Sequence, residues 1–315
     1  MSMIENKKDL EQIIQDYKEL LLNLDTFLKK VRPRSSISKT KLNQYMKKLD
    51  DITSLDENES TKLITIINKY NSIGSLLKNN NVKFNESELI KIIEGSFSFE
   101  ETDDNANDIL FELIIANRFL SSKSLNEIRI DMSNNCDLII NDEIAIECKY
   151  IHSQSNMIKN IDKAIKQINK RISNKQAKYG FVALDLTHIC QDKKFYDNIQ
   201  LIFKMYLDEN KKLSNLYLEN EFLDSVISNK NFQNSVHAYL NHTLETTFRS
   251  SFDPMKLNTN IKAVIYQCNF SFSFSYNEEI IPISSRNMTF YLNDNLNEEE
   301  KKEIENLVHS LAVGI

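Results

Sequence analysis

The residues from 136 to 151, CDLIINDEIAIECKYI, hold five charged side chains, and three of them, Asp137, Glu147 and Lys149, stand next to apolar, strand-forming residues. In an extended strand the side chains alternate between the two faces, so Glu147 and Lys149 are expected on one surface. If residues 136 to 140 pair with this strand as a hairpin, Asp137 reaches the same end of the sheet, beside Glu147. The spacing therefore predicts two carboxylates and one lysine together at one edge of a sheet.

This grouping is suited to hydrolysis of a phosphodiester bond with the help of a metal ion. Two neighbouring carboxylates repel each other unless a cation lies between them, and oxygen ligands suit Mg²⁺ or Mn²⁺. A lysine beside a metal-bound water lowers the cost of forming hydroxide there. The backbone carbonyl of Cys148 is expected to point toward the metal. We therefore take Asp137, Glu147 and Cys148 as metal ligands and Lys149 as the residue that positions the attacking water.

The neighbouring segments supply the elements that must position these residues. Residues 105 to 120 are expected to form an apolar helix that carries Glu112 among large hydrophobic residues. Strands are expected at about 126–131, 136–140 and 144–151, with NDE as the turn between the last two. The segment NMIKNIDKAIKQINKRISNK then predicts an amphipathic helix, and FVALDL a buried strand. The predicted order is helix, three strands, helix, strand.

The amphipathic helix after Lys149 is strongly basic. Its isoleucines repeat at steps of three and four, and its basic residues take the other faces. Such a surface is expected to contact the phosphates of a nucleic-acid backbone. The residues assigned to this contact are Lys159, Lys163, Lys166, Lys170 and Arg171.

The charged residues and the order of elements resemble the PD-(D/E)xK, or restriction-endonuclease-like, nuclease superfamily. Its signature is an Asp near a strand start, followed on the next strand by Glu or Asp, one residue and Lys; Asp137, Glu147 and Lys149 match it. Members often add a Glu from the preceding helix, which Glu112 matches, and some add a Gln from the following helix, which Gln167 matches.

The resemblance covers roughly residues 100 to 190, and Cys136 stands where the family has Pro. The tripeptide Glu-x-Lys also occurs elsewhere, for example at Glu5 and Glu299, so the apolar, strand-like setting of Glu147 carries the match. The resemblance implies an α/β fold with an αβββαβ core, whose mixed sheet is flanked by helices. It also implies a Mg²⁺-dependent deoxyribonuclease, an endonuclease more than an exonuclease, with a bacterial defence role against foreign DNA.

Two alternatives to a deoxyribonuclease stay open at this point. One is a helical nucleic-acid-binding or interaction protein that retains the fold without catalysis, and the other is an RNase toxin with the same metal centre. A requirement for an additional protein partner also stays open. Serine-hydrolase, glycine-rich phosphate-loop and HExxH signatures are absent from the sequence.

The chain divides into a helical region over residues 1–95 and the nuclease domain over residues 96–315. The first region has a heptad stripe and a basic segment, residues 29 to 48, with eight Lys or Arg and no acid. We expect core packing for the stripe, with a homodimer seam as the alternative, and nucleic-acid contact is considered for the basic segment. The stripe comprises Leu10, Ile13, Tyr17, Leu20, Leu24, Phe27 and Val31.

The C-terminal part of the second region is expected to be helical from residue 191 to about 250. Strands then follow, over IKAVIYQ, FSFSFSY and NMTFYLN, before a closing helix over residues 297 to 312. Strict alternation in FSFSFSY predicts an aromatic face, with serines on the other side.

Composition bounds the class of protein. The 315 residues carry a net charge of −6, which argues against coating nucleic acid through the overall field. The four cysteines are widely spaced, as in a reducing compartment, and no apolar run is long enough to span a membrane. A cytoplasmic location without membrane contact is therefore expected.

Overall fold

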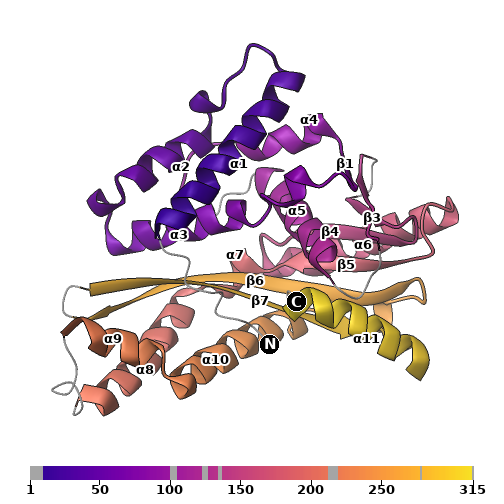
Figure 1. Cartoon of the computed structure of the whole chain (residues 1–315). Helices are drawn as coiled ribbons and strands as arrows, with labels where there is room; N and C mark the ends of the chain where they lie inside the picture. The colour runs from indigo at the N-terminus through magenta and orange to yellow at the C-terminus, as the bar shows by residue number, and fades with distance from the viewer. Residues whose placement is uncertain are drawn as a thin grey trace.

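The computed structural model describes residues 10–99, 105–122, 127–133, 137–211, 219–276 and 279–313. Cys136, at which the sequence departs from the family pattern, lies outside these ranges. Elements follow one another along the chain as helices, then a sheet with intervening helices (Figure 1). The helices are α1 (Leu10–Val31), α2 (Lys41–Asp50), α3 (Glu57–Asn71), α4 (Glu86–Leu89), α5 (Asn105–Ser121), α6 (Gln154–Ser173), α7 (Thr187–Cys190), α8 (Lys193–Asn210), α9 (Glu219–Ile227), α10 (Lys230–Arg249) and α11 (Glu298–Val313). The strands are β1 (Val82–Phe84), β2 (Ile130–Met132), β3 (Leu138–Ile140), β4 (Ile144–Tyr150), β5 (Tyr179–Asp185), β6 (Ile261–Tyr276) and β7 (Glu279–Leu292).

Within the described residues, the strands form one mixed seven-stranded sheet in the order β1 to β7. The pairs β2–β3, β3–β4 and β6–β7 are antiparallel, whereas β1–β2, β4–β5 and β5–β6 are parallel. The sheet, with helices on both faces, confirms the predicted α/β class. The predicted sequence of helix, three strands, helix and strand corresponds to α5, β2, β3, β4, α6 and β5.

The residue types in the turn between β3 and β4 suit its backbone conformation. Asn141 and Asp142 both have positive φ angles, of 52° and 57°, a conformation that these two residue types tolerate better than most. The Glu143 N–H closes the turn on the Ile140 carbonyl at 2.9 Å. The tight connection fixes the register of Leu138 opposite Ile146, and so places Asp137 one residue beyond the end of the β3–β4 pairing, beside Glu147.

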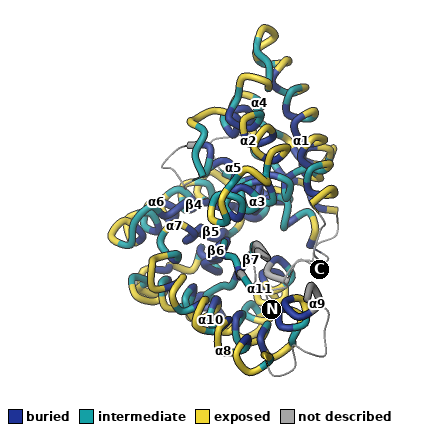
Figure 2. The backbone as a smooth tube through the Cα atoms, turned by 90° about the vertical axis from the view of Figure 1, so that its left-hand side faces the viewer, coloured by how far each residue is buried: buried dark blue, intermediate teal, exposed yellow. Residues whose placement is uncertain are grey.

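Two hydrophobic cores lie on opposite faces of the sheet. Alternation along β4 sends Ile144, Ile146 and Cys148 toward the core shared with α1, α3, α5 and α11, and Ala145 toward the core shared with α6, α8 and α10. Figure 1 shows α8 and α10 on one side of the β6–β7 ribbon and α1 to α3 on the other. In Figure 2 the buried backbone of β5 and β6 runs between these two helical layers.

The aromatic face predicted for FSFSFSY is confirmed. Phe270 and Phe274 are buried against α8, where their rings stack on Phe195 and Phe203 at centroid distances of 5.0 and 4.5 Å. The prediction of separate strands over IKAVIYQ and FSFSFSY was wrong, because both belong to the single strand β6. The last strand is also longer than predicted, since β7 pairs with β6 along almost its full length.

Most of the apolar stripe of α1 packs in the hydrophobic core of the protein. Tyr17, Leu20 and Leu24 of α1 are at most 1% exposed and belong to the core under the sheet. Core packing is thus confirmed for most of this stripe, although its first residue, Leu10, is 38% exposed. The buried side chains are not at the surface for a second chain. One part of the region predicted to be helical is a strand, because Val82–Phe84 pairs with β2. The domain division at residue 95 stays a prediction.

None of the helices in the described ranges is both long and apolar enough to cross a membrane.

Candidate active site

The structure brings the three charged residues of the predicted motif together where β3 begins beside β4, inside the sheet. Glu147 and Lys149 lie on β4, and Asp137 immediately precedes β3. The Lys149 Nζ is 3.4 Å from Asp137 Oδ2 and 3.3 Å from Glu147 Oε2. All three side chains are well shielded from solvent, with 14% exposure for Lys149, 17% for Asp137 and none for Glu147. We call these residues, together with Glu112, the carboxylate cluster.

The backbone of Cys148 holds this cluster in place. Its N–H donates to Asp137 Oδ2 at 2.6 Å, which fixes the carboxylate against the backbone of β4. Its carbonyl, predicted to face a metal, accepts a hydrogen bond from Lys149 Nζ at 2.9 Å. The thiol points to the opposite face, where burial and then the charge of Asp137 raise its pKa well above the usual value. A metal contact to the Cys148 carbonyl would therefore compete with Lys149.

Glu112 lies on α5, and burial and the charges of Asp137, Glu147 and Lys149 shift the pKa of its carboxyl. Burial raises the pKa of its carboxyl well above the usual value, and the negative charge of Asp137 raises it further. Lys149 acts in the opposite direction but does not offset these effects. The pKa of Lys149 itself is raised, because Asp137 and Glu147 together outweigh the lowering effect of burial. The cluster thus carries more negative charge than its single lysine balances.

Gln167 lies on α6, which packs against β4 on the face that carries Glu147. Its Oε1 is buried and has no hydrogen-bond partner in the part of the chain that the structure describes. A buried amide oxygen in that state is unfavourable by about 1–3 kcal/mol unless water or a ligand binds it. The observation agrees with an orienting role for Gln167, which stays a prediction.

The basic residues of α6 lie mostly on its solvent side. Lys159, Lys163, Lys166 and Lys170 are exposed, while the opposite side of α6 is buried against the sheet. Arg171 is partly buried and donates from Nη1 to Gln176 Oε1 at 3.3 Å. The lysines therefore form an outer basic surface and do not line the carboxylate cluster.

The donor set fits a divalent cation held by few protein ligands. No group of three or more His, Cys, Asp or Glu side chains with metal-binding geometry is found within the described ranges. Mg²⁺ commonly uses one or two carboxylates and completes its octahedron with water and substrate oxygens. Asp137 and Glu147, which share one lysine and raise the pKa of a neighbouring carboxyl, meet that smaller requirement.

Sequence reasoning missed a second polar site, on the face of the sheet that α3 covers. Lys41, Lys62 and Lys69 line a cavity of about 230 Å³ together with Asn107 of α5 and Asn269 of β6. We call it the lysine cavity. The signal available in the sequence was the spacing of Lys62 and Lys69, two helical turns apart on one face.

The basic residues of the segment over residues 29 to 48 either form ion pairs with acidic side chains or lie on different surfaces of the protein. Arg32 forms an ion pair with Glu94 at 2.7 Å, and Lys30 with Glu86 at 3.3 Å. Lys41 alone among its basic residues lines the lysine cavity. The segment therefore does not present a continuous positive surface.

Comparisons of the chain with protein-family models, with curated proteins and with solved structures found no match.

Proposed function

We propose that the protein is a metal-dependent nuclease that hydrolyses phosphodiester bonds of DNA at the carboxylate cluster. The observation that carries the proposal is the position of Lys149, whose ammonium lies within 3.4 Å of the carboxylates of both Asp137 and Glu147. Charge of both signs is concentrated here in a shielded site, where electrostatic stabilisation of a transition state is strongest.

The arrangement of elements supports the same proposal. The cluster lies where β3 begins beside β4, between α5 and α6, and β5 pairs with β4 in parallel. This is the order and pairing that the resemblance to the restriction-endonuclease-like superfamily implies for an αβββαβ core. Glu112 on the preceding helix and Gln167 on the following helix occupy the positions that the resemblance implies for assisting residues.

Each residue then has a role that its surroundings allow. Asp137 and Glu147 would hold Mg²⁺ or Mn²⁺, and the bound cation supplies Lewis-acid activation of water and of a phosphate oxygen. Lys149, kept protonated by its two carboxylates, orients the attacking water and balances negative charge on the phosphate. Burial and the charge of Asp137 raise the pKa of the Glu112 carboxyl, which favours its protonated form, and a bound cation would act in the opposite direction.

A second candidate function rests on the same contacts. Lys149 already contacts both carboxylates and the Cys148 carbonyl, so the cluster is also a self-contained polar network. Such a network is compatible with a non-catalytic protein that binds nucleic acid through the outer lysines of α6. The two functions differ in what they require: cleavage needs the metal and Lys149, and binding needs neither.

The test is incubation of the purified chain with plasmid, linear DNA and RNA, in Mg²⁺ or in EDTA. We expect cleavage of DNA in Mg²⁺ alone, and loss of cleavage in Lys149→Ala. The matched control is Lys302→Ala, which removes an exposed lysine of α11. Intact substrates in every condition would refute the nuclease proposal and favour the binding protein, and cleavage of RNA alone would identify a ribonuclease.

A further inference from the structure

Four lysines form a straight row along α6. Lys159, Lys163, Lys166 and Lys170 follow one another at steps of four, three and four residues, which bring successive side chains to one face of a helix. From Lys159 to Lys170 the row is about 16 Å long, at a helical rise of about 1.5 Å per residue. All four lysines are exposed. We call this row the lysine stripe.

The lysine stripe faces away from the sheet. The buried side of α6 packs on β4 and β5 and consists of Met157, Ile161, Ala164, Ile165 and Ile168. At about 100° of rotation per residue, the stripe falls on the opposite side of the helix. Glu147 lies on the face of β4 that α6 covers, and α6 lies at the margin of the molecule in Figure 2. The body of the helix therefore separates the stripe from the carboxylate cluster.

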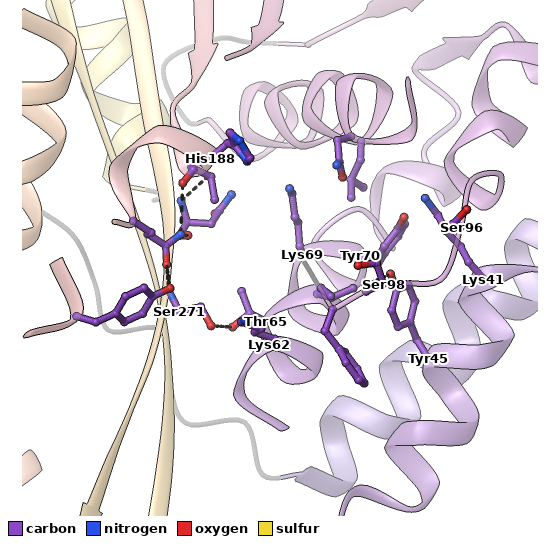
Figure 3. A pocket seen from close by; sticks show the side chains of 18 residues that line it. Lys41, Tyr45, Lys62, Thr65, Lys69, Tyr70, Ser96, Ser98, His188 and Ser271 are labelled. Atoms are coloured by element: carbon purple, nitrogen blue, oxygen red, sulfur yellow. Dashed lines mark hydrogen bonds between the residues drawn. The ribbon is translucent and has the colours of Figure 1, made fainter. Parts of the chain in front are cut away.

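The positive charge of the lysine stripe is not neutralised by neighbouring side chains. None of its four lysines forms an ion pair or a side-chain hydrogen bond in the described part of the chain. Asp162, the only acid of α6, is paired with Lys256 at 3.3 Å. Lys41, Lys62 and Lys69, which line the lysine cavity (Figure 3), differ because they all interact within the protein. The stripe therefore offers free positive charge in a chain of net charge −6.

The charge and the surroundings of the stripe favour a nucleic-acid backbone as its partner. Lysines bind phosphates as point charges, and contacts to phosphates position a nucleic acid without reading its sequence. An anionic lipid surface also attracts lysines, but a helix that lies on a membrane inserts its apolar face. The apolar side of α6 is buried against the sheet, so that face is not offered to a membrane.

We propose that the lysine stripe is an exosite for the DNA substrate, a second binding site that holds a segment of DNA outside the one that is cut. The proposal rests on the proposed function, since the bound segment is defined by its separation from the cut phosphate. Because the stripe and the carboxylate cluster lie on different sides of α6, DNA reaches both only if it extends past the helix. The stripe then assists the capture of long substrates, and the chemistry at the cluster proceeds without it.

The first test measures binding in EDTA, where metal-dependent cleavage does not occur. A fluorescent duplex of about 30 base pairs, about 100 Å long, is titrated with the full chain at several salt concentrations. If each lysine neutralises one phosphate, replacing all four should reduce the slope of log K against log salt by about 3.6 in magnitude. A fourfold rise in salt should then weaken binding by the unaltered chain about 150 times more than binding by the stripe variant. The stripe variant carries Lys159→Gln, Lys163→Gln, Lys166→Gln and Lys170→Gln.

The matched control changes the same amount of charge on other helices. It carries Lys193→Gln, Lys204→Gln, Lys230→Gln and Lys302→Gln, at exposed positions of α8, α10 and α11. Its slope should equal that of the unaltered chain, because the stripe is intact. Both variants should remain folded by circular dichroism, since exposed lysines are replaced by another good helix former.

Steady-state cleavage in Mg²⁺ then distinguishes an exosite from a role in catalysis. On the long duplex the stripe variant should have a raised KM and an unchanged kcat, because it loses binding that is the same in the ground and transition states. A hairpin with a stem of about 8 base pairs, about 27 Å long, is too short to extend past α6. The unaltered chain and the stripe variant should cleave that hairpin alike.

Three results would overturn the proposal. The first is an equal salt slope for the stripe variant and the unaltered chain. The second is a lower kcat on the long duplex or an equal loss on the hairpin, either of which would place the lysines at the cut segment. The third is binding of phosphatidylserine vesicles through the stripe without binding of DNA, which would assign a lipid surface. DNA binding that needs the stripe, without cleavage by any chain, would retain the binding site and refute the nuclease proposal instead.

Discussion

Replacement of Lys149 by Met should make the stability of the protein depend on divalent cations. The substitution keeps an unbranched apolar side chain of similar length and removes only the ammonium. Lys149 lies 3.3 Å from Glu147, which has no exposed surface, and 3.4 Å from Asp137. At an effective dielectric constant of about 20, each of these contacts corresponds to about 5 kcal/mol of attraction before desolvation is counted.

The net loss is smaller than the sum of the two attractions, because burying the lysine is itself unfavourable. Removal of one partner from a buried ion pair typically destabilises a protein by about 3–5 kcal/mol, and we expect a loss in that range for Lys149→Met in EDTA. Mg²⁺ should then replace the missing charge. At a concentration about 100 times its dissociation constant, it would restore about 2.7 kcal/mol.

Urea unfolding, followed by circular dichroism in EDTA and in Mg²⁺, measures both effects. The Lys149→Met chain should unfold at lower urea in EDTA and recover more in Mg²⁺ than the unaltered chain does. Adding Asp137→Asn should abolish the recovery, since it removes one of the two carboxylates. Lys302→Met, which alters an exposed lysine, should change stability by no more than about 0.5 kcal/mol. Equal unfolding midpoints for Lys149→Met and the unaltered protein would refute the reasoning.

Two further predictions test the surroundings of the cluster. Glu112→Gln should stabilise the protein. A carboxyl whose pKa is raised in the folded state makes its full contribution to stability only below its unfolded pKa, and this contribution is lost as the pH rises through the folded pKa. The gain, measured by urea unfolding, should therefore be larger at pH 8 than at pH 4, and a gain independent of pH would contradict it. Gly180→Ala should destabilise the protein by about 1–3 kcal/mol, because the added Cβ would lie 2.6 Å from the Ala145 carbonyl oxygen and 2.5 Å from Ile168 Cγ2. Thermal unfolding checks this, and an unchanged midpoint would mean that α6 does not pack so closely on β4 and β5.

The features near the cluster were predictable because local rules determine them. The period of two along β4 assigned Glu147 and Lys149 to one face, and the NDE turn fixed which residues of β3 lie opposite. Once the turn is tight, Asp137 has little freedom to lie elsewhere. The close approach of these three residues follows from pattern and turn chemistry alone.

The length of β6 was not predictable from the same rules. The polar residues Gln267 and Asn269 interrupt its apolar pattern, and sequence reasoning took them as the end of a strand. In the structure Gln267 is fully buried and donates to Asp185 Oδ2 at 2.9 Å, while Asn269 lines the lysine cavity. Their partners come from other elements, so tertiary contacts and not local preference keep the strand continuous.

The lysine cavity was also beyond the reach of sequence patterns. Lys41, Lys69 and Asn269 come from a helix start, a helix end and a strand that are far apart in the chain. Only the packing of α3 across β6 and β7 brings them together. A basic run can be counted in a sequence, but the division of its lysines between ion pairs and a cavity depends on the fold.

Titration of Mn²⁺ into the purified chain, followed by electron paramagnetic resonance, tests the central claim most directly. If Asp137 and Glu147 hold a divalent cation, the unaltered protein should bind Mn²⁺ in a defined stoichiometry. Asp137→Asn should then remove that binding, while Lys302→Ala leaves it unchanged. Equal Mn²⁺ binding by Asp137→Asn and the unaltered chain, or no binding by either, would contradict the account.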